Sequence, residues 1–151
     1  MLEVPILVVG IIAIVVVSLV VVFGVVYAVF GRYARGDQQT TEQEYPGARH
    51  IESGALFFGQ ESRGVMQMRG NGTLILTDDE LLFKQWVVNK EFRIPLKSIQ
   101  SIETPRSFLG KTQGVQLLKV SYLNESGAPD AIAWRVGDLA GLIRKTEEAR
   151  T

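Results

Sequence analysis

Cysteine is absent from this sequence of 151 residues, and histidine occurs only once, as His50. Without cysteine the chain forms no disulfide, builds no thiolate zinc site and offers no cysteine nucleophile. His50 stands in a polar stretch beside Arg49 and close to Glu52. We therefore expect it to be a linker residue rather than a metal ligand or an acid-base group.

An excess of charge is also absent, because 16 Lys and Arg residues balance 16 Asp and Glu residues. This balance argues against a domain built around nucleic-acid phosphates, so we predict no nucleic-acid partner. The sequence contains no phosphate-binding Gly-rich loop, no H-E-x-x-H and no G-x-S-x-G. The acidic run Asp78-Asp79-Glu80 fits a solvated turn better than a metal site. We expect no catalytic residue, metal or cofactor, and no enzymatic activity.

One long apolar run is present, from Val4 to Phe30, and none of its residues is ionisable. At ~1.5 Å per residue such a helix reaches roughly 40 Å, against about 30 Å for the hydrocarbon core of a bilayer. A cleaved signal peptide would have a basic start and a shorter apolar stretch, whereas here Glu3 precedes the run. We predict a single transmembrane anchor over residues 1–31.

The flanks of this run predict its orientation in a cell membrane. Arg32 and Arg35 follow it directly, and the bias of cytoplasmic flanks toward Lys and Arg places the C-terminal domain in the cytoplasm. Gly24 and Ala28 are four residues apart, a spacing that lets two membrane helices approach closely. This spacing is a weak signal for a homodimer.

The remaining chain divides into a polar stretch and a β-rich region. We interpret residues 32–52 as a juxtamembrane linker, helical at most up to Tyr45 because Pro46 ends a helix before itself. Residues 53–151 contain short alternating segments separated by turn residues, which is typical of an antiparallel sandwich or barrel. The expected strands are Ala55–Gln60, Val65–Arg69, Thr73–Thr77, Leu81–Val87, Glu91–Pro95, Ser101–Pro105, Val115–Leu123 and Ala131–Val136.

Alternation assigns one buried face to each of these strands. In the last strand, for example, Ile132, Trp134 and Val136 share the expected core face. Asp138 is placed to cap a helix that carries Leu139, Leu142 and Ile143 on one stripe. A single amphipathic helix is therefore expected to close the domain.

Two motifs resemble the GRAM and bacterial PH-like family. They are Gly72-Thr73-Leu74-Ile75-Leu76-Thr77, and Ile94-Pro95-Leu96-Lys97-Ser98-Ile99-Gln100-Ser101-Ile102. The resemblance implies a mainly β fold, a PH-like partly open β-barrel or sandwich with one C-terminal α-helix. It also implies a binding module without catalytic residues. Members that bind phosphoinositides carry several basic residues in the first hairpin, where this chain offers only Arg63 and then Arg69, with Glu61 among them.

Two groups of residues are candidates for a binding surface. The first is an apolar loop flanked by cations, with Arg106, Phe108, Leu109 and Lys111; such a loop either packs into the core or contacts something apolar outside. The second group, Lys84, Trp86 and Arg93, lies on neighbouring strands. An ordinary charged surface is the alternative interpretation of the second group.

These features lead to one principal hypothesis and two alternatives. The principal hypothesis is a non-enzymatic, membrane-anchored PH-like module that acts as a scaffold or regulator by binding another protein at the cytoplasmic membrane face. The first alternative is a peripheral sensor of anionic lipid headgroups. An enzyme is the second alternative, and it would require polar groups that converge in a pocket.

Overall fold

The computed structural model describes residues 6–151, apart from the side chain of Tyr33. Val4, where the predicted span begins, lies outside the described residues. By its internal contacts the chain divides into two compact units, residues 1–36 and residues 37–151.

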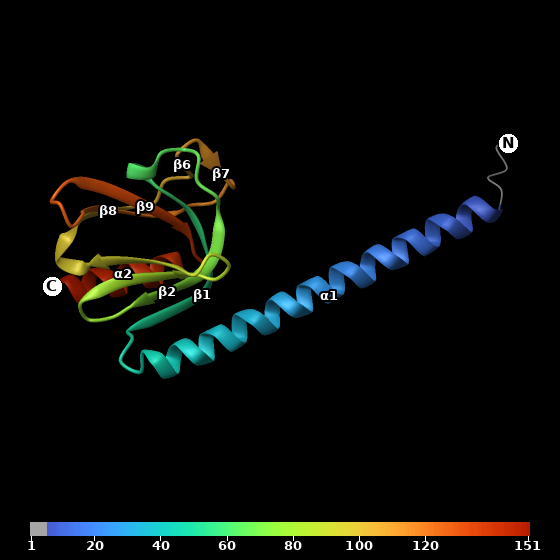
Figure 1. Cartoon of the computed structure of the whole chain (residues 1–151), viewed down its shortest axis with the longest axis horizontal. Coiled ribbons are helices and arrows are strands. Elements are labelled where there is room, and N and C mark those ends of the chain that lie inside the picture. Colours follow the sequence, from blue (N-terminus) through green and yellow to red (C-terminus); the bar gives the residue numbers. More distant parts are fainter. Residues whose placement is uncertain (1–5) are drawn as a thin grey trace. The chain divides into compact units, whose positions relative to one another are not determined.

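The first unit consists of most of helix α1, which runs from Ile6 to Glu44 (Figure 1). Its apolar part is long and hydrophobic enough to cross a membrane, with a mean hydropathy of 3.5 over 18 residues. Gly24 and Ala28 lie on this helix at the predicted spacing. The residues of the last two turns, from Asp37, belong to the second unit.

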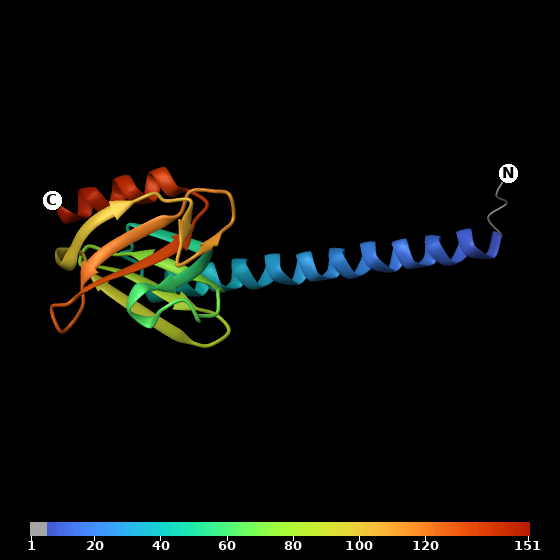
Figure 2. The ribbon, with the colours of Figure 1, turned by 90° about the horizontal axis from the view of Figure 1, so that it is seen from above.

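The second unit is built on one antiparallel sheet of seven strands, in the order β4-β3-β2-β1-β9-β8-β5. Helix α2 closes the chain, as Figure 2 shows from above. The strands are β1 (His50–Gln60), β2 (Gly70–Leu76), β3 (Glu80–Gln85), β4 (Lys90–Pro95), β5 (Ile99–Glu103), β8 (Leu118–Leu123) and β9 (Pro129–Arg135). The shorter elements are η1 (Glu61–Arg63), η2 (Leu96–Ser98), the hairpin β6 (Ser107–Phe108) with β7 (Lys111–Thr112), and α2 (Leu139–Arg150).

The interior of the curved sheet holds the main core, as strand alternation predicted. Inside it Phe57 stacks on both Phe83 and Phe92, whose rings are tilted toward each other, and the ring centroids lie 4.8 to 6.2 Å apart. Trp134 packs on Phe83 and is 1 % exposed, which confirms its predicted core position. Leu142 of α2 is fully buried against this cluster, and Asp138 caps α2 by accepting from the Gly141 amide at 3.0 Å.

The outer faces of the sheet are covered as well. Hairpin β6–β7 covers the outer side of β1 and β9, where Phe108 joins a second cluster with Phe58 and Leu117. The small side chains Ala131 and Ala133 on the same face leave room for these larger residues. The sheet therefore contributes to two separate apolar cores.

The last turns of α1 lie on the outer face of β2 and β3, where Ile75 and Leu82 are fully buried. Asp37 accepts hydrogen bonds from the Thr73 hydroxyl and, at 3.0 Å, from the Trp86 ring nitrogen. Lys84 pairs with Glu44 at 2.6 Å and lies 4.7 Å from the centroid of the Tyr45 ring. These contacts make residues 37–45 part of the folded domain.

The structure corrects two expectations about the elements and adds one hairpin. The predicted linker 32–52 is not a spacer, because α1 continues to Glu44 and β1 begins at His50. The helix ends just before Pro46, the residue expected to stop it. The predicted strand Val65–Arg69 is a loop, since β1 pairs directly with β2. The hairpin β6–β7 was not anticipated, because two-residue strands carry no periodic signal.

The contacts of residues 37–45 predict how the domain responds to truncation. A fragment 49–151 should unfold at lower urea concentration than a fragment 37–151, because it exposes the outer face of β2 and β3. Burial of Ile75 and Leu82 is worth roughly 1.5–3 kcal/mol each, so we expect a loss of about 3 kcal/mol. Equal unfolding midpoints would show that the helical turns add nothing to the domain.

Candidate functional site: a groove beside strand β4

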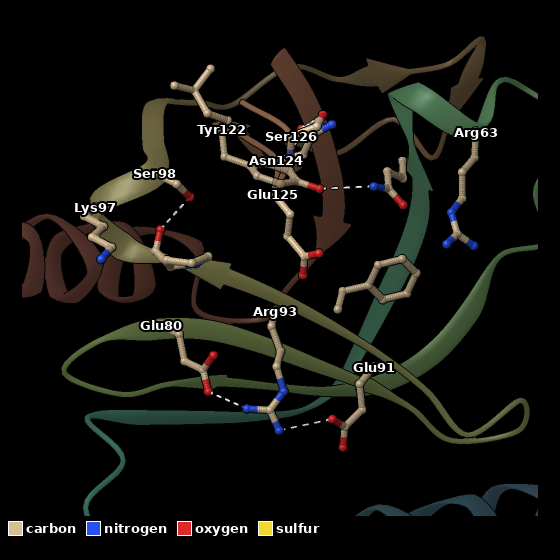
Figure 3. A pocket seen from close by; sticks show the side chains of 14 residues that line it. Arg63, Glu80, Glu91, Arg93, Lys97, Ser98, Tyr122, Asn124, Glu125 and Ser126 are labelled. Atoms are coloured by element: carbon tan, nitrogen blue, oxygen red, sulfur yellow. Dashed lines mark hydrogen bonds and ion pairs between the residues drawn. The ribbon is translucent and has the colours of Figure 1, made fainter. Parts of the chain in front are cut away.

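A groove of about 790 Å³ lies next to β4, at one edge of the curved sheet (Figure 3). Its walls come mainly from β4, from η2 and from the end of β8 with the turn that follows it. The end of β1, η1 and the start of β3 contribute one residue each. The lining residues are Gln60, Arg63, Glu80, Glu91, Phe92, Arg93, Pro95, Lys97, Ser98, Tyr122, Leu123, Asn124, Glu125 and Ser126.

Strand β4 borders this groove with a free edge, because among the described residues it pairs with β3 alone. Residues of an antiparallel strand direct their backbone groups alternately toward the partner and away from it. The Leu96 amide donates to the Asp79 carbonyl at 2.8 Å, which places Leu96 in the set that bonds to the β3 side. By alternation Phe92 and Ile94 belong to this set as well, so the amides and carbonyls of Glu91 and Arg93 point to the free edge.

Charged side chains of both signs surround the groove. Arg93 donates to Glu80 at 2.8 Å and to Glu91 at 3.2 Å, which fixes its guanidinium over the strand (Figure 3). Lys97 and Glu125 are exposed on the other walls. The groove therefore presents no single sign of charge to a ligand.

A buried carboxylate, that of Asp130, holds two residues that line the groove, Gln60 and Tyr122. Asp130 is 4 % exposed. Its oxygens accept hydrogen bonds from the side-chain amide of Gln60 at 2.6 Å and from the Tyr122 hydroxyl at 3.3 Å. The hydroxyl and backbone amide of Ser62 also donate to it, at 2.7 and 3.0 Å, and so does the Ala131 amide at 2.8 Å. The network ties the first residues of η1 to the opposite side of the barrel.

Two pKa shifts follow from this network. Burial by itself raises the pKa of Asp130, but the hydrogen bonds from Ser62, Gln60 and Ala131 stabilise the carboxylate more, and the net pKa is lowered. Burial, together with the charge of Asp130 and the hydrogen bond to it, raises the pKa of Tyr122 to about 12. At neutral pH the network thus contains a carboxylate and a neutral phenol.

The structure does not present the loop 105–111 as an apolar contact surface. Phe108 is 8 % exposed within the second core, and Leu109 packs against the same cluster. Lys111 donates to the backbone carbonyls of Gln67 and Phe58, at 2.7 and 3.3 Å. Arg106 remains exposed. The core interpretation of this loop is therefore the correct one, and the tentative binding role of Phe108 is wrong because the residue faces inward.

The second predicted group is also occupied by contacts within the chain. Lys84 and Trp86 contact the end of α1, and Arg93 is ion-paired with its neighbours on the strands. Of this group only Arg93 lines the groove. The groove was not predicted from the sequence, because its lining residues come from segments between Gln60 and Ser126 that are remote in sequence.

Comparisons with known proteins give little beyond the fold. No family model and no curated protein matches the chain. The C-terminal domain of an unknown protein from Leishmania infantum is similar in structure, with a TM-score of 0.52 and 11 % identity over 75 % of this chain and 96 % of that domain. A structure of Vav1 bound to an allosteric inhibitor matches with a TM-score of 0.43 and 14 % identity over 68 % of this chain and 26 % of Vav1. The first similarity concerns the fold alone, and the second is too weak to carry an argument.

Replacing Asp130 by Asn should destabilise the domain by roughly 2–3 kcal/mol at neutral pH, because hydrogen bonds to a buried charge are lost. The folded-state pKa of Asp130 lies below its ordinary value of 3.8, so its charge stabilises the fold above that pH. This contribution is lost as the pH falls through the lowered pKa. Urea unfolding of both proteins at several pH values should show the difference shrink only under acidic conditions.

The exposed Asp79 gives a matched control. Asp79→Asn should change the free energy of unfolding by less than about 0.5 kcal/mol. If the difference in free energy of unfolding between the parent and Asp130→Asn stayed constant down to strongly acidic pH, the assigned ionisation of Asp130 would be contradicted.

Phe108→Ala should cost roughly 3 kcal/mol of stability, because it removes a buried ring from the second core. Arg106→Ala, two residues away and exposed, should change stability by less than about 0.5 kcal/mol. Thermal or urea unfolding measures both variants. A neutral Phe108→Ala would restore the interpretation of this loop as a contact surface.

Proposed function

We propose that this chain is a membrane-anchored PH-like interaction module, which binds an extended segment of another protein in the groove beside β4. The module acts as a scaffold or regulator at the cytoplasmic face of the cell membrane, and not as an enzyme.

The strand order supports the PH-like assignment. Four strands, β1 to β4, form a meander, and β5, β8 and β9 form a second one that returns to β1. Helix α2 follows the last strand and buries Leu142 in the core. This is the layout of a partly open barrel closed by one C-terminal helix, which the motifs around Gly72 and Ile94 led us to expect.

The apolar part of α1 supports the anchor. It is long and hydrophobic enough to cross a bilayer, and Arg32 and Arg35 follow it on the side of the β domain. The bias toward cations on cytoplasmic flanks then assigns this domain to the cytoplasm.

The free edge of β4 beside a groove is the observation on which the proposed function rests. An extended peptide that adds to a sheet edge gains main-chain hydrogen bonds, and a neighbouring groove receives its side chains. The backbone groups of Glu91 and Arg93 are directed to that edge. Charged side chains and a proline on an edge strand prevent indiscriminate pairing with other chains. Strand β4 carries both, as Lys90, Glu91, Arg93 and Pro95.

Amide hydrogen exchange tests this proposal at single residues. The full chain, reconstituted in lipid nanodiscs, is used to select ligands from a library of random peptides. In the free protein the amides of Glu91 and Arg93 should exchange fast, while those of Phe92 and Ile94 are protected by β3. A selected peptide should slow exchange at Glu91 and Arg93 at least tenfold and leave Phe92 and Ile94 nearly unchanged.

The same experiment shows whether the selected peptides bind at another site. Peptides that slow exchange elsewhere, for example only in the β1–β2 loop, would refute the groove as the binding site. Val115→Ala, at an exposed position in the loop between β7 and β8 and away from the groove lining, provides a control for indirect effects. Peptide affinity should not change in this variant.

A sensor of anionic lipid headgroups is the second candidate function. It is favoured by Arg63 and Lys90, which both lie over the Phe92 ring at 5.8 and 4.9 Å from its centroid. Arg69, in the same loop as Arg63, lies 4.5 Å from the centroid of the Phe58 ring. A sensor of this type would require anionic lipid for activity in a salt-sensitive manner.

A further inference from the structure

The charged side chains that line the groove differ in whether they already have a partner. Arg93 donates to both Glu80 and Glu91, so these three charges are paired within the chain. Glu125 and Lys97 line the groove as well, and both are exposed. Among the residues that the structure describes, neither of these two side chains makes an ion pair or a hydrogen bond. We call Glu125 and Lys97 the unpaired groove charges.

Glu125 is presented by a well-ordered turn between β8 and β9. The side-chain oxygen of Asn124 accepts hydrogen bonds from the Ser126 amide at 3.0 Å, the Ser126 hydroxyl at 2.6 Å and the Ala128 amide at 3.0 Å. The Asn124 amide in turn donates to the Ala128 carbonyl at 2.9 Å. In Figure 3 the Glu125 side chain points from this turn toward β4. Its carboxylate therefore faces the free strand edge across the groove.

Lys97 lies between two anchored residues of η2, just beyond the end of β4. Leu96 is 4 % exposed in the main core. The Ser98 hydroxyl donates to the Pro95 carbonyl at 2.7 Å (Figure 3). Both neighbours of Lys97 are thus fixed, while its own side chain is exposed. An extended segment that lies along β4 would meet Glu125 on the opposite wall and Lys97 where the strand ends, at two separate positions of its sequence.

The unpaired groove charges are the groups that can distinguish one extended segment from another. Main-chain hydrogen bonds to a sheet edge are the same for every sequence, so selectivity depends on the side chains of the segment. Charge complementarity across an interface contributes mainly to specificity and to the rate of association. Arg63, the remaining charged residue of the lining, is placed over the Phe92 ring.

We propose that the segment bound beside β4 carries a basic side chain that pairs with Glu125 and an acidic side chain that pairs with Lys97. This inference rests on the proposed function, because it assumes that the groove binds an extended segment. A segment with the two charges exchanged would place like charges together, which disfavours its binding. The groove then selects by the positions of the charges and not by net charge.

Peptide selection by charge-reversed variants tests this proposal. The full chain in nanodiscs of zwitterionic lipid is used as the parent and as the variants Glu125→Lys and Lys97→Glu. Peptides that slow exchange at Glu91 and Arg93 of the parent should carry Lys or Arg at one position and Asp or Glu at another. Glu125→Lys should reverse the first preference alone, and Lys97→Glu should reverse the second alone.

A double-mutant cycle measures the pair with Glu125 directly. One selected peptide and its Lys→Glu or Arg→Glu counterpart are titrated against the parent and against Glu125→Lys. We expect the four dissociation constants to show a coupling of at least about tenfold at low ionic strength, and less in high salt, because exposed charges are screened. Glu148→Lys makes the same change of net charge on α2, outside the groove lining, and should show no coupling.

The outcomes separate this inference from the proposed function. If the peptides slowed exchange at Glu91 and Arg93 but all variants selected the same charged positions, the assigned charge pairs would be overturned, and the groove would remain the binding site. If no selected peptide slowed exchange at these two amides, the proposed function itself would be refuted, and the charge pairs with it.

Discussion

The domain depends above all on the bend in strand β1, which hydrogen-bonds to both halves of the barrel. Its first part pairs with β2 and its last part with β9, and each ladder shifts register once, at Gly54 and near Gly59. Gly54 has φ +91° and Gly59 has φ +147°, both in the region that favours glycine. A Cβ at Gly59 would also lie 2.8 Å from Leu109 of the β6–β7 hairpin. The bend directs Gln60 and η1 toward Asp130, and so positions both the groove lining and the β1–β2 loop.

Local periodicity predicted the parts of the fold in which each strand has one buried face. Ile132 and Trp134 lie in the main core and Val136 packs against it, as the alternation in the last strand predicted. The capped helix after Asp138 followed from equally local signals. The same logic failed for Val65–Arg69, where apolar residues alternate with polar ones as in a strand. Alternation reports that side chains point in two directions, but it does not report whether a second strand lies beside them.

Contacts between distant segments explain the other failures. The burial of Phe108 depends on Ala131 and Ala133, more than twenty residues away, which are small enough to admit it. Trp86, a candidate for the binding surface, instead has its ring nitrogen bonded to Asp37 at the end of α1. Nothing in the sequence near Trp86 shows that a helix some fifty residues earlier covers that face. The groove depends on the same kind of information, because its walls meet only when the sheet has curved.

The groove and the β1–β2 loop share one support. Ser62 precedes Met66 and Met68 in this loop and donates to the carboxylate of Asp130 through both its amide and its hydroxyl. Asp130 in turn accepts from Gln60 and Tyr122, which line the groove. Gln60, which lines the groove, also holds Gln67 between the two methionines. A displacement of η1 would therefore act on both the groove and the loop. Strand β4 is held in the sheet by β3, and the contacts that connect η1 with the groove are those of Gln60 and Arg63 and the hydrogen bond between Tyr122 and Asp130.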